Sequence, residues 1–402
     1  MNQRSRRWVR PELFAATVAA FVLAAGGMAS AQPALKPIDP AALQETLDEL
    51  AAEMMVPGAA MLLRTPDGEF VATYGFRGLD DRTPVTIDDH IRIGSNTKTW
   101  TGTVILQMVQ EGKIALADPV SKYRPDVPNG DNITIEQLLD MRSGLFNYST
   151  TFVLNDTLDR EPLRVWKPDE LLSIAYAVPP YFPPGQGYHY SNTNTVLLGL
   201  IAEKIDGKPL ETIFEDRLFA PLGLKETLLP ARTSNAMPAP HPRGYMYTDN
   251  VLTLATNAIP PDLQVAARNG TLRPNDQTDV NPSWGWAAGA GISTARDLAT
   301  WVEAMTGGKI LGPELQKIRM ASLRPQKEGD AGGALYGLGI AQFGPLYGHT
   351  GELPGFNTFM GSDPVNKVTL VVWTNLAPAA DGRDPATTIA RALLGHVYAG
   401  AL

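Results

Sequence analysis

The chain has 402 residues, of which 44 % are hydrophobic and 19 % charged, a composition typical of folded globular proteins and not of disordered ones. Its net charge of −8, with no basic block, argues against nucleic acid as a partner. The absence of cysteine excludes disulfides, Fe–S clusters and a cysteine nucleophile, and the 5 histidines include no closely spaced pair, so no metal site is expected.

The N-terminal segment has the three parts of a secretory signal peptide. Arginines between residues 4 and 10 precede an uncharged, mostly apolar run from Leu13 to Met28, and the small residues Ala29-Ser30-Ala31 follow. We predict that residues 1–31 are removed and that the mature protein, residues 32–402, is secreted or periplasmic. The apolar run is marginal in length for a membrane span, so an uncleaved N-terminal anchor is the alternative. No other stretch is long and apolar enough to cross a bilayer.

Apolar periodicity and turn residues predict the elements of the mature chain. Asp67-Gly68 is a hairpin turn signal, and the Pro-rich stretches 178–187 and 230–283 are expected to be largely irregular. Helices are expected at 39–55, 95–111, 134–142, 195–206, 294–306 and 385–397, and strands at 58–64, 69–76, 335–341, 346–350, 356–361 and 367–374.

The order of these elements predicts an α+β fold. Strands lie at both ends of the chain, and helices and loops fill the middle. The simplest architecture is one antiparallel sheet built from residues 39–119 and 290–402 and covered by the terminal helices. A helical and loop insertion at about 120–289 would lie beside the sheet, with a catalytic cleft between the two parts, where pockets usually form.

Ser95-Asn96-Thr97-Lys98 opens the predicted helix at 95–111. Residues three apart share one helix face, so the Lys98 amine can reach the Ser95 hydroxyl. A serine becomes a good nucleophile when a base accepts its proton, and burial or the positive end of a helix makes a lysine neutral enough to do so. The start of a helix also directs the Ser95 N–H toward a developing oxyanion. The structural alternative is a helix-capping serine with an exposed lysine.

Tyr190-Ser191-Asn192 follows a Pro/Gly-rich loop and precedes a predicted helix. A loop tyrosine relays protons well if cations hold its phenol near the anionic form. Asn192 is placed to hydrogen-bond a substrate amide. The alternative is a loop tyrosine followed by an ordinary helix cap.

His349-Thr350-Gly351 lies on a predicted strand. A cationic or hydrogen-bonding side chain facing the cleft would suit His349, and Gly351 would let a substrate backbone approach the strand closely. The alternative is a histidine at a sheet edge before a turn.

Taken together and in this order, the three motifs resemble those of the serine β-lactamase and penicillin-binding peptidase superfamily, S-x-x-K, Y-x-N and K/H-T-G. The chain is most similar to the branch that contains class C β-lactamases, D-Ala-D-Ala carboxypeptidases and esterases, from about residue 40 to 400. The resemblance implies a five-stranded antiparallel sheet flanked by helices, a helical region, and neither a metal nor an organic cofactor.

The resemblance also implies roles for the motif residues. Ser95 would be the acylated nucleophile, and Lys98 and Tyr190 would share proton transfer, with the identity of the base left open. The remaining implied roles are acyl-side amide binding by Asn192, stabilisation of charge near Tyr190 and the leaving group by His349, an oxyanion hole from the backbone N–H groups of Ser95 and Glu352, and substrate binding along Thr350, Gly351 and Glu352.

Two departures from the family pattern bear on the substrate. Glu352 stands where the family usually has Ser or Thr, and no Arg or Lys lies between Tyr336 and His349 to bind a substrate carboxylate. Such a cation would have to come from a loop, for example Arg243 or Arg268. Alternatively, the Glu352 side chain points to solvent and only its N–H is used. The departures favour reactions on uncharged groups.

The sequence therefore predicts an exported serine hydrolase that acts through an acyl-enzyme on Ser95. D-alanyl-D-alanine carboxypeptidase activity on cell-wall peptides is the leading assignment. The alternatives are an esterase or amidase, a class C-like β-lactamase, or a catalytically silent penicillin-binding protein. Expected partners are a small peptide, ester or β-lactam substrate and peptidoglycan, and the oligomeric state is left open.

Overall fold

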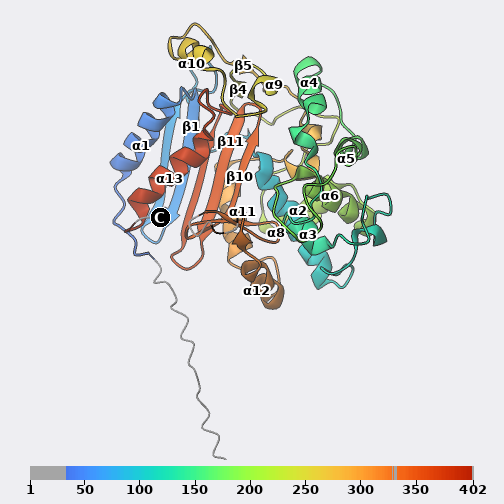
Figure 1. Cartoon of the computed structure of the whole chain (residues 1–402). Coiled ribbons are helices and arrows are strands. Elements are labelled where there is room, and N and C mark those ends of the chain that lie inside the picture. Colours follow the sequence, from blue (N-terminus) through green and yellow to red (C-terminus); the bar gives the residue numbers. More distant parts are fainter. Residues whose placement is uncertain (1–32, 328, 330–332, 401–402) are drawn as a thin grey trace, which may run out of the picture. The chain divides into compact units, whose positions relative to one another are not determined.

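A large antiparallel sheet organises the fold (Figure 1). The computed structural model describes residues 33–327, 329 and 333–400, so the predicted signal peptide lies outside the described residues. Within these ranges the sheet has 8 strands in the order β2-β1-β12-β11-β10-β9-β8-β7. The strands are β1 (Gly58–Thr65), β2 (Gly68–Gly75), β7 (Arg324–Pro325), β8 (Leu335–Tyr336), β9 (Ala341–Phe343), β10 (Leu346–Leu353), β11 (Phe356–Asp363) and β12 (Val368–Thr374).

The expectation of five strands is wrong in number but accounts for the centre of the sheet. The five long strands β2, β1, β12, β11 and β10 were all predicted, and β1 and β2 form the expected hairpin. The three added strands are two or three residues long, too short to produce a periodic signal. The predicted strand at 335–341 is in fact two such strands, because a turn that includes Gly339 in the left-handed region (φ 64°) divides it.

Both faces of the sheet are covered by helices, which explains why every residue of its central strands β11 and β12 is buried. The terminal helices α1 (Pro40–Glu53) and α13 (Pro385–Val397) pack on one face, and α11 (Ala295–Thr306) on the other (Figure 1). In β12, Leu370 and Val372 join the core beneath the terminal helices. Val371 and Trp373 join the core on the opposite face, as alternation along a strand requires.

The helical part of the molecule is centred on α2 (Thr97–Gln110) and α6 (Asn192–Asp206), which pack together. No helix of the described residues has both the length and the apolar composition needed to cross a bilayer. Residues 178–187 form no regular element, as predicted. The other helices are α3 (Ile135–Leu139), α4 (Phe152–Arg160), α5 (Pro168–Tyr176), α7 (Leu210–Phe214), α8 (Ala220–Leu222), α9 (Asn250–Thr253), α10 (Pro261–Arg268) and α12 (Pro313–Ala321).

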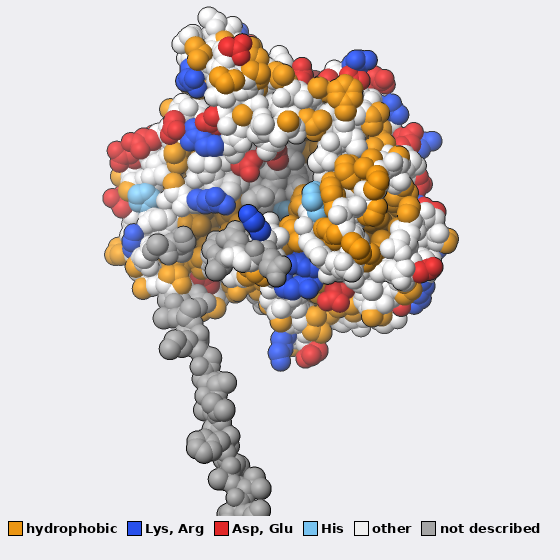
Figure 2. Space-filling model, in the orientation of Figure 1, with side chains coloured by type: hydrophobic (Ala, Val, Ile, Leu, Met, Phe, Trp, Pro, Cys, Tyr) orange, Lys and Arg blue, Asp and Glu red, His pale blue; other side chains and the backbone are white. Residues whose placement is uncertain are grey.

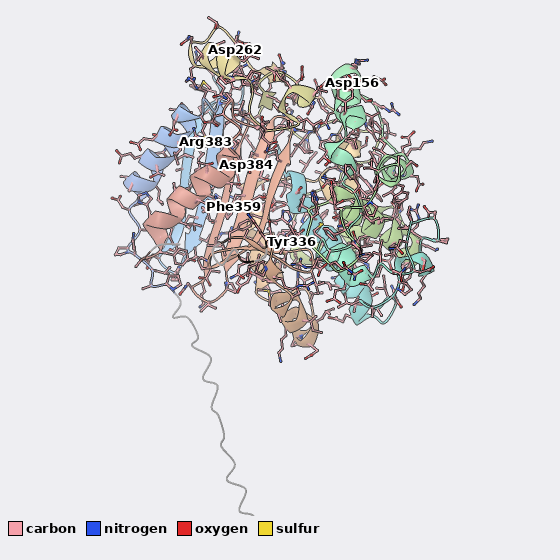
Figure 3. All side chains as sticks on the ribbon, in the orientation of Figure 1. Asp156, Asp262, Tyr336, Phe359, Arg383 and Asp384 are labelled. Carbon is pink, nitrogen blue, oxygen red and sulfur yellow. The ribbon has the colours of Figure 1, made fainter. Side chains whose placement is uncertain are left out.

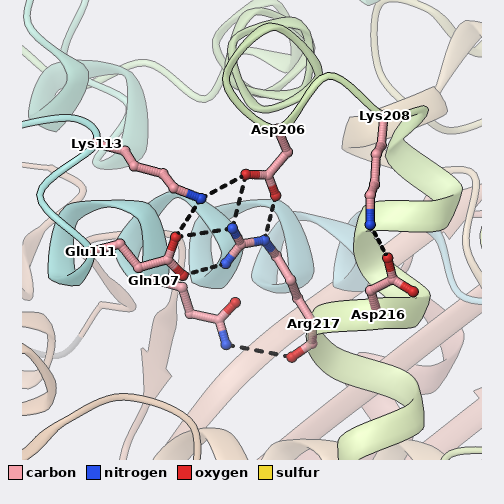
Figure 4. A network of polar contacts seen from close by, with 7 residues as sticks. All are labelled: Gln107, Glu111, Lys113, Asp206, Lys208, Asp216 and Arg217. Atoms are coloured by element: carbon pink, nitrogen blue, oxygen red, sulfur yellow. Dashed lines mark hydrogen bonds and ion pairs between the residues drawn. The ribbon is translucent and has the colours of Figure 1, made fainter.

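An ion-pair network ties the C-terminal ends of α2 and α6 together (Figure 4). Arg217, in a π-helical segment, bonds Glu111 at 2.6 Å and Asp206 at 2.5 Å, and Lys113 bonds the same two carboxylates. The hydrogen bonds from Arg217 lower the pKa of Glu111 to about 2, more than burial raises it. The network fixes the end of the helix whose other end carries Ser95.

We predict that Arg217→Ala lowers the free energy of unfolding by about 1–2 kcal/mol, a modest value because solvent screens these partly exposed charges. The pKa of Glu111 is depressed in the folded state, so its contribution is full above its unfolded value of 4.5 and is lost as the pH falls toward about 2. Denaturant unfolding should therefore show a larger loss at pH 7 than at pH 3.5. Arg160→Ala, which breaks an exposed pair within α4, is the control, and an equal loss at both pH values would contradict the electrostatic explanation.

Candidate active site

Ser95 lies in the tight turn Gly94–Asn96 that leads into α2, and this turn packs against β10. Gly94 has a φ of 53°, and a Cβ atom there would lie 2.4 Å from the backbone nitrogen of Glu352. Only glycine meets both requirements at low cost. The close contact brings the backbone of Ser95 beside that of Glu352, the two residues whose N–H groups the family resemblance assigns to the oxyanion hole.

Lys98 lies one helical turn after Ser95, with its Nζ 2.9 Å from Ser95 Oγ. The same amine donates a hydrogen bond of 2.7 Å to the carbonyl oxygen of Ala288. The residue is 1 % exposed, and no carboxylate among the described residues pairs with it. Burial without a counter-charge holds the pKa of Lys98 well below its usual 10.5. A neutral amine beside a serine hydroxyl can accept that hydroxyl's proton.

Tyr190 comes from the Pro-rich loop before α6, and its ring centroid lies 4.7 Å from Lys98 Nζ. Burial raises the pKa of Tyr190, while the nearby Ser95 lowers it by less. Its hydroxyl has no partner with hydrogen-bond geometry among residues 33–327, 329 and 333–400. The phenol is therefore protonated at neutral pH. The sequence-based mechanism needed a phenol held near its anionic form, and the rise in pKa is in the opposite direction. The group is placed as a proton donor facing the cleft.

His349 lies on β10 with both ring nitrogens occupied. Its Nδ1 is 2.6 Å from the carbonyl oxygen of Thr350 and must donate to it, so Nε2 accepts from the Tyr336 hydroxyl at 3.1 Å. Burial lowers the pKa of His349 to about 3. The imidazole is therefore neutral, where the sequence suggested a cationic or hydrogen-bonding group. Tyr336 is a site residue that the motifs did not reveal, although the resemblance includes the segment around it.

Asn192 is the first residue of α6, and only one end of its side-chain amide has a hydrogen-bond partner among the described residues. Its Nδ2 donates to Ser149 Oγ at 2.8 Å, whereas its Oδ1 has no partner among the described residues. The residue lines a cavity of about 250 Å³ together with Ser149, Trp284 and Glu352. An unpaired amide oxygen there can accept a hydrogen bond from a substrate N–H group, the role that the resemblance implies.

Six of the eight predicted site residues line one cleft between the sheet and the helical part (Figure 2), and Asn192 lines the smaller cavity beside it. Its volume is about 490 Å³, and it adjoins the smaller cavity through Asn257 and Glu352. Lys98 lies buried behind Ser95. No group of three His, Asp or Glu side chains suited to a metal ion occurs in the described ranges. The cleft is lined by Ser95, Tyr190, Tyr336, His349, Thr350, Gly351 and Glu352, by Asp384 just before α13, and by Thr387 and Arg391 of α13.

The two arginines suggested as carboxylate ligands do not line this cleft. Arg243 pairs with Asp276 at 2.5 Å in a separate cavity, and Arg268 ends α10. The cation that does line the cleft is Arg391, which the sequence gave no reason to choose. The Glu352 side chain is half-buried and accepts a hydrogen bond from Asn357 at 3.1 Å, so it does not extend freely into solvent.

The comparison with protein families decides the relationship. A model of the beta-lactamase family matches residues 43–394, nearly the whole described chain. The chain belongs to this family. It is thus a member of the serine hydrolases that share the β-lactamase and penicillin-binding-protein fold, and its Ser95, Lys98 and Tyr190 occupy the arrangement described above.

Several solved structures and curated proteins are similar over most of this chain. A D-stereospecific amidohydrolase from Streptomyces sp. is 30 % identical with a TM-score of 0.74, covering 89 % of this chain and 99 % of that one. A D-amino acid amidase from Ochrobactrum anthropi SV3 is 26 % identical with a TM-score of 0.74, covering 89 % and 98 %. A D-aminopeptidase from Cereibacter sphaeroides is 28 % identical, covering 89 % of this chain and 64 % of that protein. The chain spans 34 % to 61 % of the length of the first curated relatives.

We predict that Lys98→Arg lowers kcat/KM for an activated ester about 1000-fold, because arginine stays protonated and cannot accept the Ser95 proton. In the unmodified enzyme, kcat/KM should rise with pH as Lys98 loses its proton, with a midpoint well below 10.5. Lys309→Arg, at an exposed position, should leave the profile unchanged. Activity that stays low until about pH 10 and rises only there would contradict a lowered pKa for Lys98 and its role as the base.

We predict that Gly94→Ala lowers kcat at least about 100-fold, because the added methyl group pushes the Ser95 turn away from Glu352 and opens the oxyanion hole. It should also lower the free energy of unfolding by more than about 1 kcal/mol, since alanine is strained at this φ. Gly395→Ala is the control, because a Cβ atom there meets nothing within 4 Å. Ester turnover and thermal unfolding measure both effects, and wild-type values for Gly94→Ala would refute the assignment.

Proposed function

We propose that this protein is an exported amidase that cleaves small D-amino-acid amides or peptides through an acyl-enzyme on Ser95. The observation that carries the proposal is the buried Lys98 amine, which has no counter-charge among the described residues and lies 2.9 Å from the hydroxyl of Ser95, a residue that lines a cleft of about 490 Å³. Similarity to the D-stereospecific amidohydrolase, the D-amino acid amidase and the D-aminopeptidase supports the substrate class. The signal-like segment at 1–31 supports export to the periplasm or medium.

In the proposed acylation step, Ser95 Oγ attacks the substrate carbonyl carbon and its proton moves to Lys98 Nζ. The backbone N–H groups of Ser95 and Glu352 stabilise the oxyanion. When the carbon–nitrogen bond breaks, the leaving amine takes the Tyr190 hydroxyl proton, and Lys98 returns a proton to Tyr190. The amine departs neutral, the ester bond to Ser95 remains, and Lys98 is again uncharged.

In the proposed deacylation step, a water molecule attacks the ester carbon and gives its proton to Lys98. The bond to Ser95 breaks, and Ser95 recovers a proton from Lys98. The neutral state of His349 suits this sequence, because a buried cation beside Lys98 would make its protonation harder. In this scheme His349 contributes no charge. It helps to hold the site in position through its hydrogen bond with Tyr336 and its place on β10.

D-alanyl-D-alanine carboxypeptidase activity on cell-wall peptides is the second candidate, and Arg391 is the observation that favours it. The guanidinium of Arg391 is exposed in the cleft, where it can meet the terminal carboxylate of a peptide. Glu352 opposes this candidate, because a carboxylate on the same cleft wall repels an anionic substrate. Under this candidate, peptidoglycan peptides are the natural substrate.

The first test offers the purified mature protein D-phenylalanine amide, N-acetyl-D-Ala-D-Ala and benzylpenicillin in separate reactions, with Ser95→Ala beside each. We expect release of ammonia from the amide, and its loss by at least about 1000-fold in Ser95→Ala. Ser173→Ala, at an exposed position on α5, controls for the loss of a hydroxyl. Hydrolysis of the dipeptide with a lasting penicillin adduct, and no action on the amide, would replace the amidase by the carboxypeptidase. No reaction with any of the three, nor with a short activated ester, would refute both.

A further inference from the structure

One wall of the active-site cleft combines Glu352 of β10 with a single face of α13. Asp384 precedes the helix, and Thr387 and Arg391 follow at intervals of three and four residues, so all three project from the same side. Figure 3 shows Asp384 where α13 begins, beside the sheet. The catalytic scheme uses none of these three side chains, and it uses Glu352 only through its backbone.

The Glu352 carboxylate is held toward α13 by a chain of hydrogen bonds. Asn357 donates to Glu352 Oε2 at 3.1 Å, and its own Oδ1 accepts from the N–H of Ala386 at 3.0 Å. Asn357 is 1 % exposed, so this support is rigid. Burial raises the pKa of Glu352, and the neighbouring Asp384 carboxyl raises it further. A cation bound at this wall favours the ionised form of Glu352.

Asp384 occupies the capping position of α13 but does not cap it. Its side chain makes no hydrogen bond to the first turn of the helix, although aspartate at this position usually does. It also takes part in no ion pair among the described residues. The Asp384 carboxyl lies beside Glu352 in the cleft lining, and the first turn of α13 has no side-chain cap.

Thr387 supplies an independent sign that something binds at this wall. It is only 9 % exposed and lines the cleft, yet its hydroxyl oxygen has no hydrogen-bond partner among the described residues. Buried hydroxyls are nearly always paired, so an orphan that lines a cleft indicates a ligand that supplies the missing bond.

We propose that Glu352, Asp384 and Thr387 form a subsite that binds a primary ammonium group of the substrate. An ammonium carries one positive charge and three N–H donors, and this wall offers two carboxylates and a hydroxyl to accept them. The inference rests on the proposed amidase and names the charge that its substrate carries. The group is either the α-ammonium of the acyl residue or an ammonium on its side chain.

Arg391 limits where the ammonium binds. It lies one helical turn beyond Thr387 on the same face and has no ion-pair partner in the described ranges. Its charge repels a cation from that end of the wall, so the ammonium is confined to the end formed by Glu352 and Asp384. The Lys98 amine lies behind Ser95 and is hydrogen-bonded to Ser95 and to the Ala288 carbonyl, so it does not compete for the two carboxylates.

The test compares four p-nitroanilides: D-alanine and D-lysine derivatives with a free α-amine, N-acetyl-D-alanine, and Nα-acetyl-D-lysine. We expect kcat/KM to be about 10- to 100-fold higher for the substrate whose ammonium reaches the subsite than for its uncharged counterpart, as expected for a hydrogen-bonded charge. Preference for free α-amines over N-acetyl-D-alanine identifies the α-ammonium. Preference for Nα-acetyl-D-lysine over N-acetyl-D-alanine identifies the side-chain ammonium.

Glu352→Gln keeps the shape and removes the charge, so the preference ratio should fall about 10-fold or more, mainly through KM. Asp384→Asn should lower the same ratio. Glu45→Gln, exposed on α1 away from the cleft, should leave it unchanged. Equal turnover of charged and uncharged substrates, or a ratio unaffected by both variants, would overturn the subsite. Because N-acetyl-D-alanine p-nitroanilide reports Ser95-dependent hydrolysis without an ammonium, failure of the amidase itself would be seen separately, as no turnover of any of the four.

Discussion

The site depends on a lysine amine that is removed from water with no counter-charge. Lys98 would lose most of its solvation if it were charged, and the single carbonyl of Ala288 does not replace it. Burial therefore favours the neutral amine, so an amine that is protonated in water can act as a free base beside Ser95. The same burial acts on Tyr190 in the opposite sense, because it disfavours the phenolate. Burial thus makes Lys98 a proton acceptor and keeps Tyr190 a proton donor, within a few ångströms of each other.

That arrangement requires the two parts of the molecule to meet at α2. Almost every residue of α2 is buried, because the helix packs against α6 and the sheet-side turn Gly94–Asn96 packs against β10. Ser95, the proposed nucleophile, comes from the turn that leads into α2. Glu352, the proposed second oxyanion donor, comes from the sheet, and Tyr190 comes from the loop before α6. A shift of either part would separate these groups, which explains why a glycine that permits close backbone contact lies at the junction.

The sequence predicted the local part of the site and not the part that depends on tertiary packing. Ser95 and Lys98 are three residues apart on one helix, so their contact follows from helix geometry alone. The sequence could also predict that side chains alternate between the two faces of β10, and in the structure Thr350 and Glu352 are half-buried whereas His349 and Gly351 are buried. The sequence could not predict which face of β10 meets α13, because that depends on how the last helix crosses the sheet. Thr387 and Arg391 were missed for this reason. Tyr336 lies on β8, which was predicted together with the start of β9 as one strand at 335–341, because strands of two or three residues carry no period of their own.

The acidic and basic side chains of the cleft lie away from the groups that the proposed reaction uses, so the residues that would select the substrate differ from those that would act on it. Burial lowers the pKa of both Lys98 and His349 and so disfavours positive charge at the reacting centre, which leaves it little with which to attract an anionic substrate. The charged groups stand on the wall formed by Glu352 and α13, acidic at one end and with Arg391 at the other. A substrate is therefore sorted by where it carries its charge along that wall, before Ser95 acts on it. Relatives that share the catalytic arrangement but differ at this wall can act on different amides, which is why the motifs alone identify the reaction and not the substrate.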